Sequence, residues 1–313
     1  MKMPCLCFSV CISLCASLCV RPALVWSGFP APNPPPLQIP RSFHDLARPP
    51  PAASASSGGH YQQLVRQGFE AMVADSLQRA DLLFPQALLE APEAQANAVI
   101  YGQLAAIAER QGKEQEALED YDIALRLAPQ QTSLLLGRAS LYLKLGRDDR
   151  ARADYDAVLT LRPDHPEALV MRAYTFQRSH LFKEARADYQ KLLSLQPAHE
   201  QALLGLALVC EKDRRPREAM ELVNRAVELY PTHADGYALR AGFEADRKQY
   251  ERAEEDFAEA IRLSPEDPSL YLARAQFFTR LKRTSDARED TQRAARLGAT
   301  AEEIAGALGM KAQ

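Results

Sequence analysis

The chain lacks the residue patterns by which most enzymes and metalloproteins are identified. It has no glycine-rich phosphate loop, no His-Glu-x-x-His pair and no nucleophile elbow. Five of its six cysteines lie within the first 19 residues, which leaves Cys210 as the one thiol in the rest of the sequence. A single thiol forms neither an intramolecular disulfide nor a thiolate metal site. We therefore expect no catalytic residues, no cofactor and no metal ligands, and we expect Cys210 to be a small buried hydrophobe.

An excess of positive charge is absent too. The chain has a formal net charge of −3, and the part after residue 60 contains 34 basic and 40 acidic residues. A protein with this balance lacks the basic surface that neutralises phosphate groups, so nucleic acid is not expected as the main partner. No sequence pattern points to a small-molecule substrate either.

One long uncharged run is present, and it lies at the N-terminus. It extends over about 16 residues, Cys5 to Val20, and follows Lys2. This run is short for a membrane-spanning helix and matches the hydrophobic part of a secretory signal. Residues 1–28 are therefore interpreted as a signal peptide or membrane anchor, with processing after Ser27. An exported protein, periplasmic or secreted, is expected; membrane contact would be through this segment alone.

Two alternatives for the N-terminus stay open. The first is a retained or lipid-modified anchor, although leucine rather than a small residue precedes Cys15 and Cys19. The second is a start codon assigned too far upstream, which would leave the protein cytoplasmic. In either case residues 29–60 are rich in proline, serine, alanine and glycine. A segment of this composition buries too little apolar surface to offset the entropy of ordering, so it is expected to be a disordered linker.

The remaining sequence repeats itself every 34 residues. If the first residue of each repeat is called position 1, proline stands at position 32, alanine at positions 8 and 20, and leucine at position 30. Position 24 is mostly aromatic. The proline and alanine series are Pro129, Pro163, Pro197, Pro231 and Pro265; Ala105, Ala139, Ala173, Ala207, Ala241 and Ala275; and Ala117, Ala151, Ala185, Ala219, Ala253 and Ala287.

Each period predicts two helices, over about positions 1–14 and 18–31. Small residues at positions 8 and 20 allow the two helices to approach closely, and the ring at position 24 fills the space beside them. Proline at position 32 ends the second helix because it cannot extend the hydrogen-bond ladder. A fixed period of this length is typical of a helical-pair solenoid.

The pattern resembles the tetratricopeptide repeat (TPR) family over residues 61–299. The resemblance implies an all-α fold, a right-handed α-solenoid of stacked helix-turn-helix repeats, and binding of other proteins instead of catalysis. Regular repeats are expected at 98–131, 132–165, 166–199, 200–233, 234–267 and 268–299.

The two ends of the array are expected to differ from the regular repeats. Residues 61–97 form a degenerate N-terminal repeat, in which Pro85 predicts a kink or a late start of the second helix. At the other end Gly298 is expected to terminate the last repeat. Thr300 and Glu303 have the spacing of a capping box, so residues 300–313 are expected to hold a capping helix, reaching about Met310, and a tail.

Arginine at position 7 occurs together with aspartate at position 23. The fourth repeat replaces both with Leu206 and Leu222, whereas the first repeat combines Leu104 with Asp120. Pairing within a repeat fits five of six repeats, so an ion pair between the two helices of one repeat is expected. The four pairs are Arg138–Asp154, Arg172–Asp188, Arg240–Asp256 and Arg274–Asp290.

Three histidines, His165, His199 and His233, share position 34 of successive repeats. Equivalent points on neighbouring helices lie roughly 8–10 Å apart, whereas zinc ligands lie about 2 Å from the metal. They are therefore expected at loops or helix starts and not as metal ligands.

In the TPR family, ligands usually lie along the concave face formed by the first helices, at positions 2, 5, 9, 12 and 13. Here position 5 is mostly apolar, and position 13 is basic in five of six repeats. An apolar strip edged by cations suits an amphipathic or acidic peptide or helix of a partner protein. Alternatively, each cation only complements its helix dipole. The expected groove residues, called the groove set below, are Arg110, Leu136, Lys144, Val170, Tyr174, Arg178, Leu204, Leu208, Lys212, Leu272, Gln276 and Arg280.

A second function stays open beside peptide capture. The chain could be a structural or assembly subunit that binds a larger complex through its convex or terminal surfaces. The two functions differ in where binding-defective substitutions would fall: on the groove set, or on the N-terminal repeat (residues 61–92) or the C-terminal end (residues 300–313).

Overall fold

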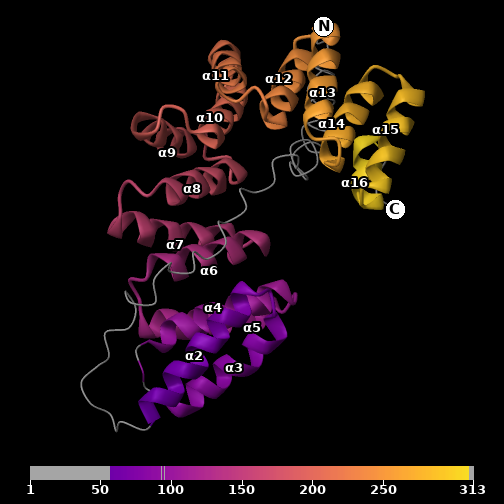
Figure 1. Ribbon diagram of the computed structural model, residues 1–313. Helices are drawn as coiled ribbons and strands as arrows, with labels where there is room; N and C mark the ends of the chain where they lie inside the picture. The colour runs from indigo at the N-terminus through magenta and orange to yellow at the C-terminus, as the bar shows by residue number, and fades with distance from the viewer. Residues whose placement is uncertain (1–56, 93, 95, 310–313) are drawn as a thin grey trace, which may run out of the picture. The chain divides into compact units, whose positions relative to one another are not determined.

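The computed structural model describes residues 57–92, 94 and 96–309, and these residues form fifteen α-helices and no strand. The predicted signal peptide and most of the predicted linker lie outside the described residues. None of the described helices is both long and apolar enough to span a bilayer. The helices are α2 (Ser57–Val73), α3 (Leu77–Glu90), α4 (Asn97–Arg110), α5 (Glu114–Leu127), α6 (Thr132–Lys144), α7 (Asp148–Leu161), α8 (Pro166–Arg178), α9 (Phe182–Leu195), α10 (Glu200–Lys212), α11 (Pro216–Leu229), α12 (Ala234–Asp246), α13 (Tyr250–Leu263), α14 (Pro268–Arg280), α15 (Thr284–Arg296) and α16 (Ala301–Ala307) (Figure 1).

The described chain divides into two compact units, and the division falls inside α8, after Thr175. In the first unit α2 packs on α3, α4 on α5, and α6 on α7; in the second, α10 packs on α11, α12 on α13, and α14 on α15. The second helix of a repeat also packs on the first helix of the next, as in α5–α6 and α11–α12. This consecutive packing of helix pairs confirms the all-α solenoid class.

The second helices run one residue earlier than expected, from position 17 to position 30 in the first five regular repeats. The residue at position 31 leaves helical geometry, with φ of −138° at Ala128, −137° at Arg162 and −132° at Ser264. Each of these residues precedes a proline, whose ring disfavours the helical conformation of the residue before it. Proline therefore ends the helix two residues before its own position.

The small residues at positions 8 and 20 form the contact between paired helices, as the sequence predicts. All twelve alanines are at most 1% exposed. The rings at position 24 are buried as well; Tyr121 and Tyr155 are each 1% exposed. A glycine of the next repeat makes room for one of these rings, because a Cβ atom added at Gly137 would lie 2.6 Å from the Tyr121 hydroxyl.

The turn between the two helices of each repeat has a backbone feature that the sequence does not reveal. Position 15 has a positive φ in all seven repeats, although only two of the residues are glycine. Left-handed geometry costs other residues free energy, so these turns carry strain in five repeats. The residues are Asp75, Gly112, Gly146, His180, Arg214, Lys248 and Lys282, with φ between 53° and 74°.

The N-terminal repeat differs from the expectation in two ways. Its first helix begins at Ser57, four residues before Tyr61, and its second runs unbroken from Leu77. The expected late start at Pro85 is therefore wrong. Pro85 is exposed, whereas its neighbour Phe84 is fully buried. Burial of Phe84 holds the helix together at the point where proline removes one hydrogen bond.

A buried asparagine joins this repeat to the regular array. Asn97 is fully buried, donates to the carbonyl oxygens of Ala91 at 2.6 Å and Pro92 at 3.1 Å, and accepts from the Tyr61 hydroxyl at 2.9 Å. These bonds fix the segment in which three extra residues interrupt the period.

The C-terminal end matches the sequence prediction closely. Gly298 has a φ of +101° and follows Leu297, the residue that caps α15. The Thr300 hydroxyl oxygen accepts from the Glu303 amide at 3.3 Å, and the Glu303 carboxylate accepts from the Thr300 amide at 2.8 Å, which completes the capping box. The helix that follows ends at Ala307, three residues earlier than expected.

Candidate partner-binding site

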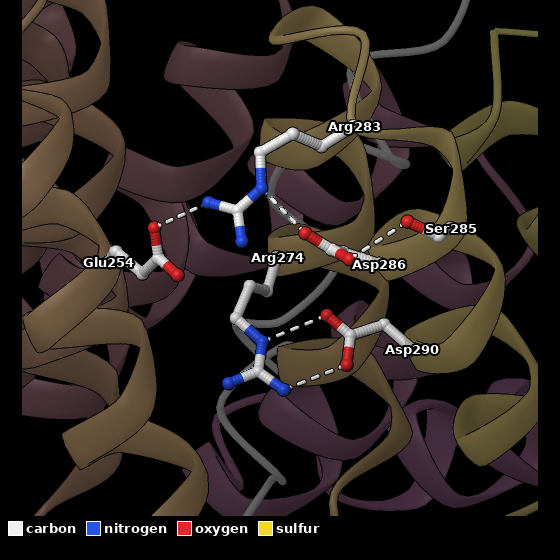
Figure 2. Close-up of polar contacts among 6 residues, drawn as sticks. All are labelled: Glu254, Arg274, Arg283, Ser285, Asp286 and Asp290. Carbon is white, nitrogen blue, oxygen red and sulfur yellow. Dashed lines mark hydrogen bonds and ion pairs between the residues drawn. The ribbon is translucent and has the colours of Figure 1, made fainter.

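The paired charges of positions 7 and 23 join the two helices of a repeat. Arg274 donates to Asp290 through Nε at 2.8 Å and Nη2 at 2.7 Å, and the carboxylate is only 4% exposed (Figure 2). The same bidentate geometry, with distances of 2.6–2.9 Å, is found for Arg138–Asp154 and Arg240–Asp256. The expected ion pair within a repeat is confirmed in these three cases, and its role is structural.

Two of these arginines, Arg138 and Arg240, also reach the preceding repeat, which the pairing of positions 7 and 23 does not predict. Arg138 Nη1 donates to Asp122 at 2.6 Å, and Arg240 Nη1 donates to Asn224 at 3.3 Å. Asp122 and Asn224 both stand at position 25. The polar residue at position 25 is the sequence feature from which this contact between repeats could have been predicted. Arg138 and Arg240 therefore join the two helices of their own repeat and also link that repeat to the preceding one.

A second arginine in the last repeats forms a comparable link at the surface. Arg283 donates to Glu254 at 2.7 Å and to Asp286 at 2.5 Å, and the Ser285 hydroxyl donates to Asp286 at 3.0 Å (Figure 2). These residues are exposed or half-buried, so the link contributes little to stability.

The first regular repeat has the aspartate without its arginine. Asp120 stands at position 23, but position 7 is Leu104. Burial, followed by the neighbouring charges of Glu116, Glu119 and Asp81, raises the pKa of Asp120 to about 6. No ion pair to Asp120 exists among the described residues.

The histidines and the cysteine take the structural roles expected of them. His199 Nδ1 accepts from the Ala202 amide at 3.3 Å and His165 Nδ1 from the Ala168 amide at 3.4 Å, so both act at helix starts. Burial lowers the pKa of both histidines. Cys210 is fully buried, and burial raises the pKa of its thiol to about 12.

The five cations of the groove set are all exposed, each at the end of a first helix. Three of them lie near a carboxylate of the preceding repeat. The nitrogen–oxygen distances are 3.5 Å for Arg110–Asp75, 3.4 Å for Lys144–Glu114 and 2.8 Å for Arg280–Asp246. Lys212 has no such partner in the part of the chain that the structure describes. The fifth cation, Arg178, ends α8.

The apolar members of the groove set are less accessible than expected. Leu204 is fully buried, and the exposed fractions of Val170, Leu208 and Leu272 are 4%, 8% and 7%. Leu272 packs in a cluster with Ala307 of α16. Leu136, Tyr174 and Gln276 are half-buried. Because most of the apolar side chains belong to the core, what the groove set offers a partner is mainly its row of cations.

A cleft of about 630 Å³ lies elsewhere, between α11, α12 and α13. Its lining includes Arg217, Arg240, Glu244, Arg252 and Asp256. Two residues of α12 line the cleft, Arg240 at position 7 and Glu244 at position 11. Because an α-helix turns about 100° per residue, these positions lie on roughly the opposite face of the helix from positions 5 and 9. The cleft and the groove set are therefore separate surfaces. The sequence feature that marks the cleft is Glu244 at position 11, where the TPR pattern has tyrosine.

Comparison with known proteins agrees with this architecture. The family model described as tetratricopeptide repeat matches residues 103–166, 170–234 and 244–302, more than half of the chain. A tetratricopeptide repeat protein from Parabacteroides merdae is similar in structure, with a TM-score of 0.74 and 26% identity, over 80% of this chain and 98% of that one.

Two more distant structures share the fold alone. The APC/C hetero-tetramer Cut9–Hcn1 has a TM-score of 0.56 and 14% identity, over 79% of this chain and 55% of that one. The pilF protein of Pseudomonas aeruginosa has a TM-score of 0.51 and 15% identity, over 67% and 95%. No curated protein sequence matches the chain.

Proposed function

Since the chain belongs to the tetratricopeptide repeat family, we propose that it is a non-catalytic scaffold that binds a segment of a partner protein. The observation that carries the proposal is the row of exposed cations at position 13 of the first helices. An acidic peptide or helix complements such a row. The apolar side chains beside the cations are mostly buried, which favours an acidic partner over one that binds through an apolar face.

A pull-down with cross-linking tests this proposal. The full chain is compared with the double variant Arg178→Glu/Lys212→Glu, which changes two groove cations. The control variant Lys183→Glu/Arg296→Glu makes the same change of charge on exposed residues of second helices. We expect a partner that the parent and the control variant capture and the groove variant loses, at unchanged helicity by circular dichroism. Equal capture by all three proteins would contradict binding through the groove set.

A specific observation favours the second candidate function, an assembly subunit that binds through a terminal surface. Leu82 and Leu89 lie seven residues apart on α3 and are 68% and 82% exposed, and Val73 at the end of α2 is 72% exposed. Leucines so exposed on a terminal repeat can contact another protein. If Leu82→Asp/Leu89→Asp abolishes capture and the groove variant does not, the chain binds through this end.

We also propose that the protein is exported, on the basis of the uncharged run in residues 1–28, which lie outside the described residues. Trp26 is the single tryptophan of the chain. Processing after Ser27 would therefore remove all indole fluorescence from the mature protein. Detection of tryptophan in the protein recovered from the cell would rule out this processing.

A further inference from the structure

A buried carboxyl group at the cleft between α11, α12 and α13 has an unused acceptor. Glu244, in the last turns of α12, is 7% exposed and contributes to the lining. Its Oε2 atom is buried and has no hydrogen-bond partner among the described residues. A buried acceptor without a donor destabilises a folded protein, and such groups in native structures call for an explanation.

Two arginines of the lining, Arg240 and Arg247, are already engaged in other hydrogen bonds. Arg240 is held by Asp256 and Asn224, as described above. Arg247 donates to the Phe243 carbonyl at 2.6 Å, to Glu211 at 2.8 Å and to the Pro216 carbonyl at 2.9 Å. Neither arginine donates to Glu244 Oε2, which therefore stays available.

The charges around Glu244 agree with this geometry. Burial raises the pKa of its carboxyl group, and Asp256 acts in the same direction, whereas Arg240 and Arg252 oppose the shift. A cation brought to this carboxyl group from outside would oppose the shift and favour the carboxylate form.

Two further arginines of the lining, Arg217 and Arg252, differ from Arg240 and Arg247 in exposure and in partners. Arg217 and Arg252 are exposed, and neither has a hydrogen bond or ion pair among the described residues. The cleft therefore combines the buried acceptor of Glu244 with two exposed cations, Arg217 and Arg252, and one exposed carboxylate, Glu255. A volume of about 630 Å³ exceeds one side chain and lies in the usual range of ligand sites, about 300–1,000 Å³.

We propose that this cleft binds a cationic side chain of a partner protein, an arginine or a lysine, that donates to Glu244 Oε2. An acidic residue of the partner, close to that arginine or lysine on the same segment, contacts Arg217 or Arg252. The terminal torsion of glutamate is broad, so the carboxylate can turn to meet the entering group. The proposal depends on the proposed function only in taking the partner to be a protein.

Methyl NMR of the full chain tests the site directly. The chain has six methionines, of which Met1, Met3 and Met310 lie outside the described residues. Met220 lines the cleft, whereas Met72 and Met171 lie on other helices, so ¹³C-methyl methionine labelling gives one reporter at the site and two described reporters away from it. N-acetyl-arginine amide is expected to shift the Met220 signal saturably and to leave the other two unchanged. N-acetyl-glutamate amide is expected to have no effect at the same concentration.

Two matched variants separate binding from structure. Glu244→Gln keeps the size of the side chain and is expected to lower the affinity for the arginine probe at least tenfold. Glu255→Gln, which changes an exposed residue of the lining, is expected to leave this affinity unchanged. Glu244→Gln should also keep or raise Tm, because the free protein no longer buries an unpaired carboxylate. A fall in Tm of more than about 4 °C would show that Glu244 is a structural residue and would overturn the proposal.

The remaining outcomes are equally decisive. A Met220 shift with the glutamate probe alone would overturn a cation site, and so would the absence of a Met220 shift with either probe. An acetylated Arg-Ala-Glu peptide should bind more tightly than the single arginine, and equal affinity would contradict the part given to Arg217 and Arg252. Glu244 lies on the opposite face of α12 from the groove positions. Glu244→Gln therefore tests the cleft and Arg178→Glu/Lys212→Glu tests the groove set, so either proposal can be contradicted without the other.

Discussion

At the scale of single residues, the fourth repeat shows what the buried arginine–aspartate pair contributes. Leu206 and Leu222 replace both charges there, and Leu206 is 3% exposed. An apolar pair and an ion pair therefore satisfy the same position of the fold. The reason is that desolvation of two charges offsets much of their attraction, whereas an isolated buried charge has no compensation.

Changes to the Arg274–Asp290 pair should reproduce this equivalence. Arg274→Leu alone leaves Asp290 buried without its cation and should lower the free energy of unfolding by about 3 kcal/mol. The double variant Arg274→Leu/Asp290→Leu should come within about 1 kcal/mol of the parent. Urea denaturation of the four proteins of the cycle measures both values. A double variant as unstable as the single one would contradict the argument.

The unpaired Asp120 predicts a dependence of stability on pH. Its pKa of about 6 in the folded protein lies above the ordinary value of 3.8, so the folded state binds the proton more tightly than the unfolded state. This group therefore lowers stability as pH rises from about 4 to about 6. Asp120→Asn should raise the free energy of unfolding at pH 7 by about 1 kcal/mol, because Asp120 is only half-buried and partly screened.

The gain from Asp120→Asn should shrink towards zero at pH 4, which denaturation at the two pH values measures. A gain of the same size at both would show that the effect is not electrostatic. Leu104→Arg provides a second check, since it supplies the position 7 arginine that the other repeats have, and it should stabilise the protein at pH 7 but not at pH 4.

At the scale of the helix pair, the turn at position 15 is the feature that the sequence conceals. Five of its seven residues are not glycine, yet all seven have a positive φ. The two helices of a repeat are held by buried contacts at positions 8, 20 and 24. Those contacts set the path of the turn, so residues with side chains accept the left-handed region at a cost in free energy.

Substitutions in these turns should change stability in opposite directions. Gly146→Ala places a Cβ atom at a φ of +70° and should lower the free energy of unfolding by about 1 kcal/mol. Lys248→Gly relieves the strain at a φ of +62° and should raise it by about 0.5 kcal/mol. Gly59→Ala, in the open helical site of α2, is the control and should not destabilise the protein. Thermal denaturation distinguishes the three; destabilisation by Lys248→Gly would contradict the argument.

At the scale of the whole molecule, the described array ends differently at its two termini. At the C-terminal end α16 packs on α14 and α15, and its residue Ala307 joins a cluster with Tyr271, Leu272 and Ala294. At the N-terminal end α3 leaves Leu82 and Leu89 exposed. Solenoids need terminal units that shield the apolar face of the last repeat, and here the C-terminal helix meets that need.

Removal of residues 300–313 should therefore expose Tyr271 and Leu272, which are 8% and 7% exposed in the intact chain. The shortened protein should lose about 2 kcal/mol of stability from the apolar area that becomes accessible, and it should bind the dye ANS more strongly. Thr300→Ala/Glu303→Ala, which breaks only the capping box, should lose about 1 kcal/mol. An unchanged Tm after truncation would show that α16 does not protect the last repeat.

The sequence by itself determined the helix pairs, the alanine contacts at positions 8 and 20 and the Arg–Asp pairs inside a repeat, because each depends on spacing within one 34-residue period. It also determined the capping box at Thr300 and Glu303. Only the tertiary structure decided which apolar groove residues stay accessible: Leu204 and Leu208 share a helix face with exposed Lys212, yet the core covers both.

The tertiary structure alone also decided the hydrogen bonds of Asn97 and the cleft at Glu244. Both depend on side chains from neighbouring helices, far apart in sequence, whose approach is set by packing. A periodic pattern reports which face of a helix a residue occupies, but burial, hydrogen-bond partners and strained turns depend on how closely the next helix packs against that face.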